Sequence, residues 1–245
     1  MKIKFAFGFV FLFALASIAF AQAVKITPLK TVYRRAVKKD FAHKKTFVVT
    51  RPKVSGLSQA LNRKIETAVS FERVFDFNLK EEQTEMFWLD KAGYATEFNR
   101  DGILGVALTI DGSGAYPSVN TKHVVVNLKT GTPVKPEDIF SADKIPEVVR
   151  LVDDRLQETM KSAISEVKKD SAEDGAALTE MLAEKRFETE NLSHFSVNEK
   201  GVTFYYDYGF SHATLALEPN GELFTSYADL KAFIKPDGLL GKFIR

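Results

Sequence analysis

Hydrophobic and polar positions alternate with a period of two in several short segments, which turn residues separate. Near the start, residues 24–33 and 41–51 carry β-branched and aromatic side chains at this spacing, which predicts two extended segments. Two later units, over residues 94–110 and 195–208, each read as a strand, a turn that ends in glycine, and a second strand. After these units, further strands are expected over residues 122–128 and 212–217.

Apolar side chains recur at helical spacing elsewhere. Over residues 57–79 they predict one long amphipathic helix or two shorter ones. An unbroken apolar stripe over residues 145–167 predicts a long helix, which two lysines close as the helix dipole prefers. Further helices are expected over residues 176–187 and after Ser226, where Asp229 completes a candidate capping box.

These elements predict the fold class and the organisation of the chain. Hairpins with segregated helices indicate an α+β fold, with antiparallel sheets and helices packed on one side. No linker rich in glycine, serine or proline divides the sequence. We therefore expect a signal peptide over residues 1–21, an N-terminal α+β region over 22–100 and a C-terminal α+β domain over 101–245. The last two are expected to pack as one unit.

The first 21 residues are typical of a secretory signal peptide. Lys2 and Lys4 precede an apolar run, and Ala19-Phe20-Ala21 places small residues at the two positions that signal peptidase reads. The run is slightly shorter than the roughly 20 residues that span a bilayer. Cleavage after Ala21 is therefore favoured over the alternative, a membrane anchor. We expect a secreted or periplasmic protein with no membrane span after cleavage.

Composition excludes several classes of protein. The 245 residues contain no cysteine, which excludes disulfides, thiolate metal sites and cysteine nucleophiles. Without residues 1–21 the chain has 32 basic and 32 acidic residues, and an exported neutral chain is not typical of nucleic-acid binding.

The charge is distributed unevenly. Residues 25–64 hold twelve Lys or Arg and a single acid, Asp40, whereas the remainder is acidic. Two interpretations are open. The charges pair internally, or the surface has a basic pole suited to an anionic wall polymer and an acidic pole suited to a cationic protein.

No catalytic or metal-binding motif is apparent. The histidines His43, His123, His194 and His212 form no known metal spacing, and the first two are expected as surface residues of strands. Ser113 lies in a glycine-flanked loop that lacks the strand–turn–helix context of a hydrolase nucleophile. Adjacent acids are typical of solvated helix surfaces rather than of two carboxylates facing each other across a cleft. We expect no catalytic residue, no metal and no cofactor.

Several short motifs, taken in order, resemble a known family. The chain from residue 101 onward is similar to the domain of unknown function that ends the extracytoplasmic region of lysozyme-sensing anti-sigma-V factors. The same domain precedes the catalytic domain of peptidoglycan deacetylases. Residues 51–57 and 61–65 are similar to its companion N-terminal domain. The motifs of the main domain lie at residues 101–106, 112–117, 126–131, 136–140, 195–197, 201–205 and 226–231.

The resemblance implies an exported, non-catalytic module that binds or senses a cell-envelope ligand, either a lysozyme-type protein or peptidoglycan. We find neither the sigma-binding segment and membrane helix of an anti-sigma factor nor the catalytic domain of a deacetylase. We therefore expect the binding module alone. Two alternatives are kept: an envelope hydrolase whose acidic site is assembled from scattered residues, and a structural subunit of the envelope.

The candidate ligand-binding residues form one loop rich in small side chains. Such a loop is expected at the end of a sheet, where a partner can approach its backbone closely. Family members often carry a histidine where Tyr116 stands, so this chain departs from the family there. Tyr116 is an interface anchor or, alternatively, packs over the edge of the sheet. The loop consists of Gly112, Ser113, Gly114, Ala115, Tyr116 and Pro117.

Overall fold

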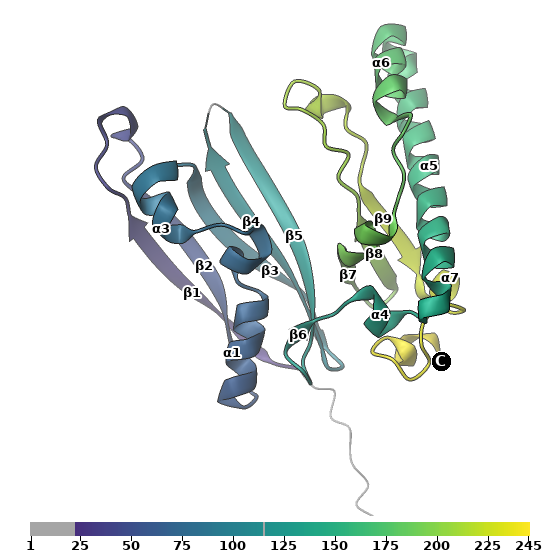
Figure 1. The fold of residues 1–245 in the computed structure, drawn as a ribbon, viewed down its shortest axis with the longest axis horizontal. Coiled ribbons are helices and arrows are strands. Elements are labelled where there is room, and N and C mark those ends of the chain that lie inside the picture. The colour runs from purple at the N-terminus through teal and green to yellow at the C-terminus, as the bar shows by residue number, and fades with distance from the viewer. Residues whose placement is uncertain (1–22, 115) are drawn as a thin grey trace, which may run out of the picture.

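The computed structural model describes residues 23–114 and 116–245, which form two β-sheets with helices packed on them (Figure 1). The predicted signal peptide and Ala115 lie outside the described residues. The strands of the first sheet are, in spatial order, β1 (Lys25–Arg34), β2 (Thr46–Ser55), β3 (Leu89–Arg100), β4 (Ile103–Ser113), β5 (Pro117–Asn127) and β6 (Thr132–Pro133). Those of the second are β7 (Phe195–Val197), β8 (Gly201–Tyr205) and β9 (Glu222–Ser226).

The first sheet is mixed rather than wholly antiparallel. Its pairs are antiparallel hairpins, except that β2 and β3 run parallel where Val48 and Val49 face Lys91 and Ala92. A parallel pair needs a crossover connection, and the helices between β2 and β3 supply it. The predicted α+β class is confirmed, and the expectation of purely antiparallel sheets is corrected for this one pair.

The crossover covers one face of the first sheet. It consists of α1 (Gln59–Ala68), α2 (Phe71–Phe75), α3 (Leu79–Glu81) and a π-helical turn over Glu82–Met86. Ser58 caps α1 by accepting a hydrogen bond from the Leu61 amide. Of the two predicted alternatives, one long helix or two shorter ones, the shorter helices are found: the chain breaks between α1 and α2, and Ile65 and Phe71 are both buried in the core of the first sheet.

The second sheet packs against a long helix. α5 (Ile145–Asp170) agrees with the predicted stripe and continues for three more residues. α6 (Ala172–Leu182) starts earlier than expected because the Ser171 side chain caps it, and α4 (Pro136–Ile139) and α7 (Tyr227–Leu230) are short. Val152 and Leu156 of α5 are buried together with Phe204 of β8.

The molecule has two hydrophobic cores, and β4 contributes to both. Leu104 belongs to the core of the first sheet, while its neighbour Ile103 belongs to the core around the second sheet. We call residues 23–134 the first lobe and residues 135–245 the second lobe. β3 ends and β4 begins at the predicted boundary near residue 100, and the two strands pair with each other. Both predicted regions therefore contribute strands to the first sheet. The division of the chain into these two regions stays a prediction.

The strand expected over residues 212–217 is wrong. This segment is a turn followed by a 3-10 helix over Leu215–Leu217. Upstream, the Asp207 side chain accepts a hydrogen bond from the Gly209 amide at 2.8 Å, and Gly209 has a φ of +68°. This turn bends the chain out of β8, which already pairs with β7 on one side and β9 on the other. Among the described residues, no helix is both long and apolar enough to cross a membrane.

Candidate functional site

The candidate loop is a tight turn between two long strands. β4 includes Gly112 and Ser113, and β5 begins at Pro117. The Gly114 amide donates a hydrogen bond to the Tyr116 carbonyl at 3.3 Å across the turn. Gly114, Tyr116 and Pro117 are exposed. The turn therefore lies at the end of the sheet, as the sequence predicts.

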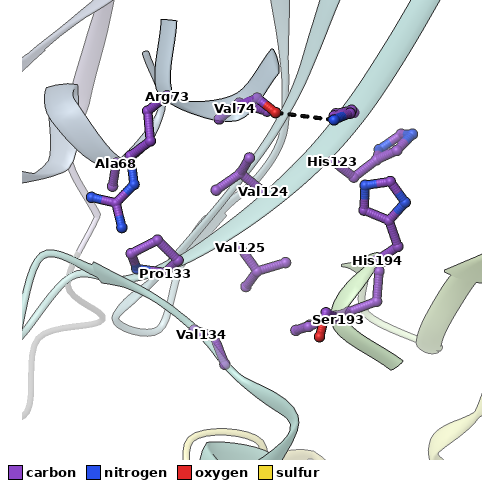
Figure 2. A pocket seen from close by; sticks show the side chains of 12 residues that line it. Ala68, Arg73, Val74, His123, Val124, Val125, Pro133, Val134, Ser193 and His194 are labelled. Atoms are coloured by element: carbon purple, nitrogen blue, oxygen red, sulfur yellow. Dashed lines mark hydrogen bonds between the residues drawn. The ribbon is translucent and has the colours of Figure 1, made fainter. Parts of the chain in front are cut away.

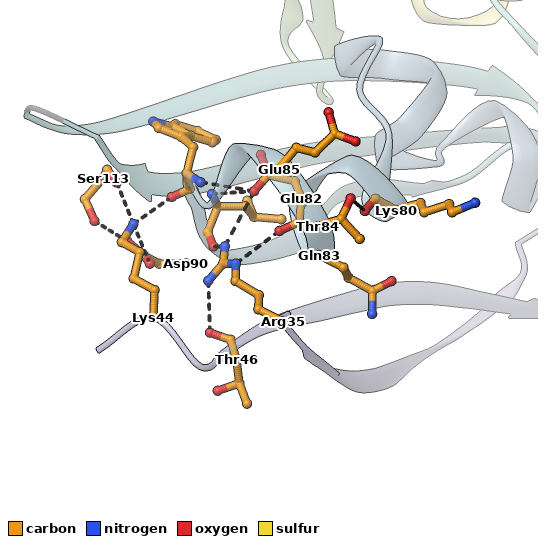
Figure 3. A network of polar contacts seen from close by, with 12 residues as sticks. Arg35, Lys44, Thr46, Lys80, Glu82, Gln83, Thr84, Glu85, Asp90 and Ser113 are labelled. Atoms are coloured by element: carbon orange, nitrogen blue, oxygen red, sulfur yellow. Dashed lines mark hydrogen bonds and ion pairs between the residues drawn. The ribbon is translucent and has the colours of Figure 1, made fainter. Parts of the chain in front are cut away.

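A polar network fixes Ser113 at the base of the turn (Figure 3). Its hydroxyl donates to Asp90 Oδ2 at 2.6 Å, and its amide donates to the Trp88 carbonyl at 2.9 Å. Lys44, from the β1–β2 connection, forms an ion pair with Asp90 at 3.2 Å and also donates to the carbonyls of Trp88 and Ser113. Ser113 is thus engaged in holding the turn, and it is the last residue of β4 rather than the loop residue that the sequence predicts.

Packing explains why residue 112 of the candidate loop is a glycine. A Cβ atom at position 112 would lie 2.6 Å from both the ring and the carbonyl oxygen of Trp88. Real Cβ atoms do not approach other atoms so closely, so Gly112 is required by Trp88. The need for a small residue here does not depend on a ligand.

Tyr116 contacts the second lobe. Its ring stacks on that of His212, with centroids 4.3 Å apart and planes inclined by 22°. His212 belongs to the connection between β8 and β9. Tyr116 nevertheless remains 62% exposed. The pair presents an exposed aromatic stack at the start of β5.

β5 also has an open outer edge among the described residues. Its only partner beyond β4 is the two-residue strand β6, which pairs with Val126 and Asn127. Residues 117–121 are all exposed, including Val119 at 66%. The first half of β5 is therefore accessible along its length.

A basic pocket of about 230 Å³ lies beside the middle of β5 (Figure 2). Four basic side chains line it: Arg73 of α2, Lys122 and His123 of β5, and His194 of the second lobe. No acid is among its described lining residues. The remainder of the lining is mainly apolar and consists of Ala68, Val74, Val124, Val125, Pro133, Val134, Ser193 and Phe195.

Two of these basic groups are held in place by neighbours. Lys122 Nζ donates to the Val74 carbonyl at 3.1 Å and lies 5.4 Å from the ring centre of Phe75. His123 Nδ1 is 3.0 Å from Glu97 Oε2, and its ring stacks on Tyr205 at 3.7 Å. Their positions are therefore fixed before any ligand binds.

His194 is electrostatically sensitive to what occupies the pocket. Burial lowers its pKa below the ordinary value, and the positive charges of Lys122 and His123 lower it further, while Asp207 acts in the opposite direction. An anion in the pocket would offset the repulsion from these cations. The pocket is therefore suited to a carboxylate or another small anionic group.

Two histidine expectations are corrected. His123 is not a surface residue, because its side chain is only 14% exposed between Glu97 and Tyr205. His43 is exposed but lies in the connection between β1 and β2 rather than in a strand. The sequence missed the basic pocket because its residues come from four separate segments; the adjacent Lys122 and His123 were its one local signal.

Acidic groups gather elsewhere. Glu158 of α5 and Glu222 of β9 line a shallow depression together with Arg155. Burial raises the pKa of Glu218, and Asp207 raises it further.

Within residues 23–114 and 116–245, no three His, Asp or Glu side chains are placed to hold a metal ion.

Comparisons with known proteins place the fold. No protein-family model and no curated protein matches the chain. A member of the DUF3298 family from Bacteroides fragilis superposes with a TM-score of 0.56 at 15% identity, over 91% of this chain and 98% of that one. A DUF3298 family protein from Pseudomonas aeruginosa gives 0.55 at 12% identity, over 88% and 96%. The chain therefore has the α+β fold of solved proteins from a domain-of-unknown-function family.

Proposed function

We propose that this protein is an exported, non-enzymatic module that binds a cell-envelope ligand, and that peptidoglycan is the ligand. One observation carries the proposal: the open strand β5 begins at an exposed aromatic stack and passes a basic pocket at its middle. Both features also involve the second lobe, through His212 and His194. The aromatic stack and the basic pocket together form the proposed binding surface, along the interface between the lobes.

The dimensions of this surface suit a polymer. Tyr116 and His123 are seven residues apart, which corresponds to about 23 Å along an extended strand. Peptidoglycan repeats two kinds of group over such lengths. Its sugar rings suit an exposed aromatic face, and the carboxylates of its stem peptides suit a cluster of basic side chains.

The charge distribution supports an anionic ligand on the first lobe. The first lobe has eighteen Lys or Arg against eleven Asp or Glu, and the second has fourteen against twenty-one. Among the described residues, two ion pairs join the lobes: Arg100 with Glu199, and Lys242 with Asp101. Most of the opposite charge is therefore left on the two surfaces rather than paired between them.

A lysozyme-type protein is the second candidate ligand. Such proteins are cationic, and the acidic second lobe would attract them. The basic pocket beside β5 would not attract a cationic protein. The two ligands should therefore bind different faces of the molecule.

Co-sedimentation with insoluble peptidoglycan tests the proposal, with lysozyme-coated beads in parallel. We expect wild type to sediment with peptidoglycan, and Tyr116→Ala and Arg73→Ala to bind at least tenfold more weakly. Phe224→Ala and Arg63→Ala are matched controls, since both change exposed residues that belong neither to the aromatic stack nor to the lining of the basic pocket. Equal binding by all variants, or retention on lysozyme alone, would contradict a peptidoglycan site along β5.

A hydrolysis assay separates binding from catalysis. Wild type incubated with peptidoglycan should release no soluble fragments. Release that Glu158→Gln or Glu222→Gln abolishes would instead establish a hydrolase, with its site in the depression between α5 and β9.

A further inference from the structure

The tip of the first hairpin exposes apolar side chains to solvent. We call residues 35–45, which connect β1 and β2, together with Met86 beside them, the hairpin tip. Val37 is 99% exposed, Met86 62% and Phe41 39%. Phe41 stacks on Phe87 with ring centroids 5.1 Å apart and still exposes part of its ring, whereas Val37 and Met86 are exposed more fully.

Basic side chains surround these apolar groups. Six Lys or Arg occur over residues 34–45. Arg35 pairs with Glu82 and Lys44 with Asp90, while Lys38 lies 4.7 Å from the ring centre of Phe87 and 3.5 Å from the Glu85 carbonyl. Four of the six side chains are exposed, as is His43; they are Arg34, Lys38, Lys39 and Lys45. The exposed acids beside them are Asp40 and Glu85, so the hairpin tip is clearly cationic.

The base of the hairpin tip is rigid (Figure 3). Arg35 is buried, and its guanidinium donates to the carbonyls of Thr46, Glu82 and Leu89. The Ala36 amide donates to the Gln83 carbonyl at 2.8 Å. The connection is therefore held against the π-helical turn at Arg35 and Ala36.

A hollow of about 420 Å³ lies within the hairpin tip. Apolar side chains, among them Val37 and Phe41, line it together with Arg34, Lys38, Lys44 and Lys45. A ligand with an apolar part and an anionic head matches both kinds of lining. Phospholipids at a bilayer surface have this chemistry.

We propose that the hairpin tip docks on the surface of an anionic phospholipid bilayer. Val37, Phe41 and Met86 enter the boundary between headgroups and acyl chains, while Arg34, Lys38, Lys39 and Lys45 contact lipid phosphates. The hairpin tip belongs to the β1–β2 side of the sheet, whereas the peptidoglycan surface follows β5 at the other side (Figure 1). Because Lys44 of the hairpin tip also reaches the Ser113 carbonyl at the turn between β4 and β5, the two proposals are tested with separate variants and separate probes.

The apolar groups favour a bilayer over a soluble polyanion. A polyanion would need only the cations, and three solvated apolar side chains would add nothing to its binding. A bilayer removes those side chains from water, which contributes in proportion to the apolar area buried.

Vesicle co-sedimentation of the mature chain tests the proposal. The probes are vesicles of phosphatidylcholine alone and of equal parts phosphatidylcholine and phosphatidylglycerol. We expect binding to the anionic vesicles only. The variant Lys39→Gln/Lys45→Gln should bind about 30-fold more weakly, because each lysine near an anionic surface contributes about fivefold. Val37→Asp should bind about tenfold more weakly or worse. Val119→Asp and Lys64→Gln, at exposed sites elsewhere in the first lobe, should bind like wild type.

A fluorophore reports insertion directly. Because the chain has no cysteine, Val37→Cys accepts a single environment-sensitive label, and its emission should shift to the blue on anionic vesicles. The same label on Val119→Cys should not shift. Equal binding to both vesicle types overturns the proposal. So does loss of binding in the lysine variant with full binding in Val37→Asp, which would identify a polyanion site instead.

Discussion

Tyr116 and His212, 4.3 Å apart between ring centroids, join the turn between β4 and β5 to the connection between β8 and β9. The candidate loop of the first lobe is thereby positioned by the second lobe. Tyr116 contacts the second lobe through this stack, and its role as an interface anchor stays a prediction. It is partly engaged in the protein and still exposes most of its surface.

A double-mutant cycle on this pair measures the contact between the lobes. Stacked aromatic pairs contribute about 0.5–1.5 kcal/mol beyond the area they bury, and the exposure of Tyr116 places this pair at the lower end. We expect Tyr116→Ala and His212→Ala to show a coupling of about 0.5 kcal/mol in the free energy of unfolding. Additive effects would mean that the stack does not persist in solution.

Gly112→Ala should destabilise the fold. The added methyl group would lie 2.6 Å from both the ring and the carbonyl oxygen of Trp88, so the indole and the backbone must both move, and overpacking of this kind costs about 1–3 kcal/mol. Gly93→Ala is the matched control on the neighbouring strand, because nothing lies within 4 Å of its Cβ position. Urea denaturation of both variants checks this expectation. Equal stability of the two would contradict a packing requirement for Gly112.

The sequence predicts elements whose signals are local. The glycine-ended turns and the stripe of α5 correctly identify β3–β4, β7–β8 and the long helix. Phe204 and Tyr205 lie on opposite faces of β8, as adjacent residues of a strand do: Phe204 is buried in the second core, and Tyr205 stacks on His123 of the first lobe.

Features that depend on contacts between residues far apart in the chain are not predicted from the sequence. The apolar residues over 212–217 alternate like a strand, but both edges of β8 are already occupied, and the Asp207–Gly209 turn diverts the chain. The spacing of Arg73, His123 and His194 likewise does not indicate that they line one pocket. They do so because one lobe packs on the other.

Arg35 and Glu82 should be important for stability. Their side chains are 0% and 7% exposed, and removal of one partner of such a buried pair costs about 3–5 kcal/mol. Arg35→Met should therefore lower the free energy of unfolding by that amount. Arg35→Lys should rescue little, because a lysine cannot reach the same set of carbonyl acceptors. Arg34→Met, an exposed neighbour, is the control; a loss as large in the control would refute a specific role for the buried pair.

Export predicts a defined mature N-terminus. If signal peptidase cleaves after Ala21, the protein recovered from the periplasm or the medium should begin at Gln22. Intact-mass spectrometry of the secreted product measures this directly. A full-length product retained with the membrane would instead establish the anchor alternative.

The titration of His194 should report occupancy of the basic pocket. Burial, Lys122 and His123 hold its pKa below the ordinary value of 6.5, against the effect of Asp207. Because the unfolded chain then binds the proton more tightly, His194 contributes stability above about pH 6.5 that is lost as the pH falls toward its folded pKa. His194→Asn should therefore make the free energy of unfolding less dependent on pH in this window.

The same residue distinguishes an occupied pocket from an empty one. In NMR titrations, with the His194 signal assigned from its loss in His194→Asn, Lys122→Met should raise the pKa of His194 by removing a nearby positive charge. Soluble peptidoglycan fragments should raise it as well, since their carboxylates favour the protonated ring. Fragments that bind without moving the titration of His194 would place the ligand's anionic groups outside the basic pocket.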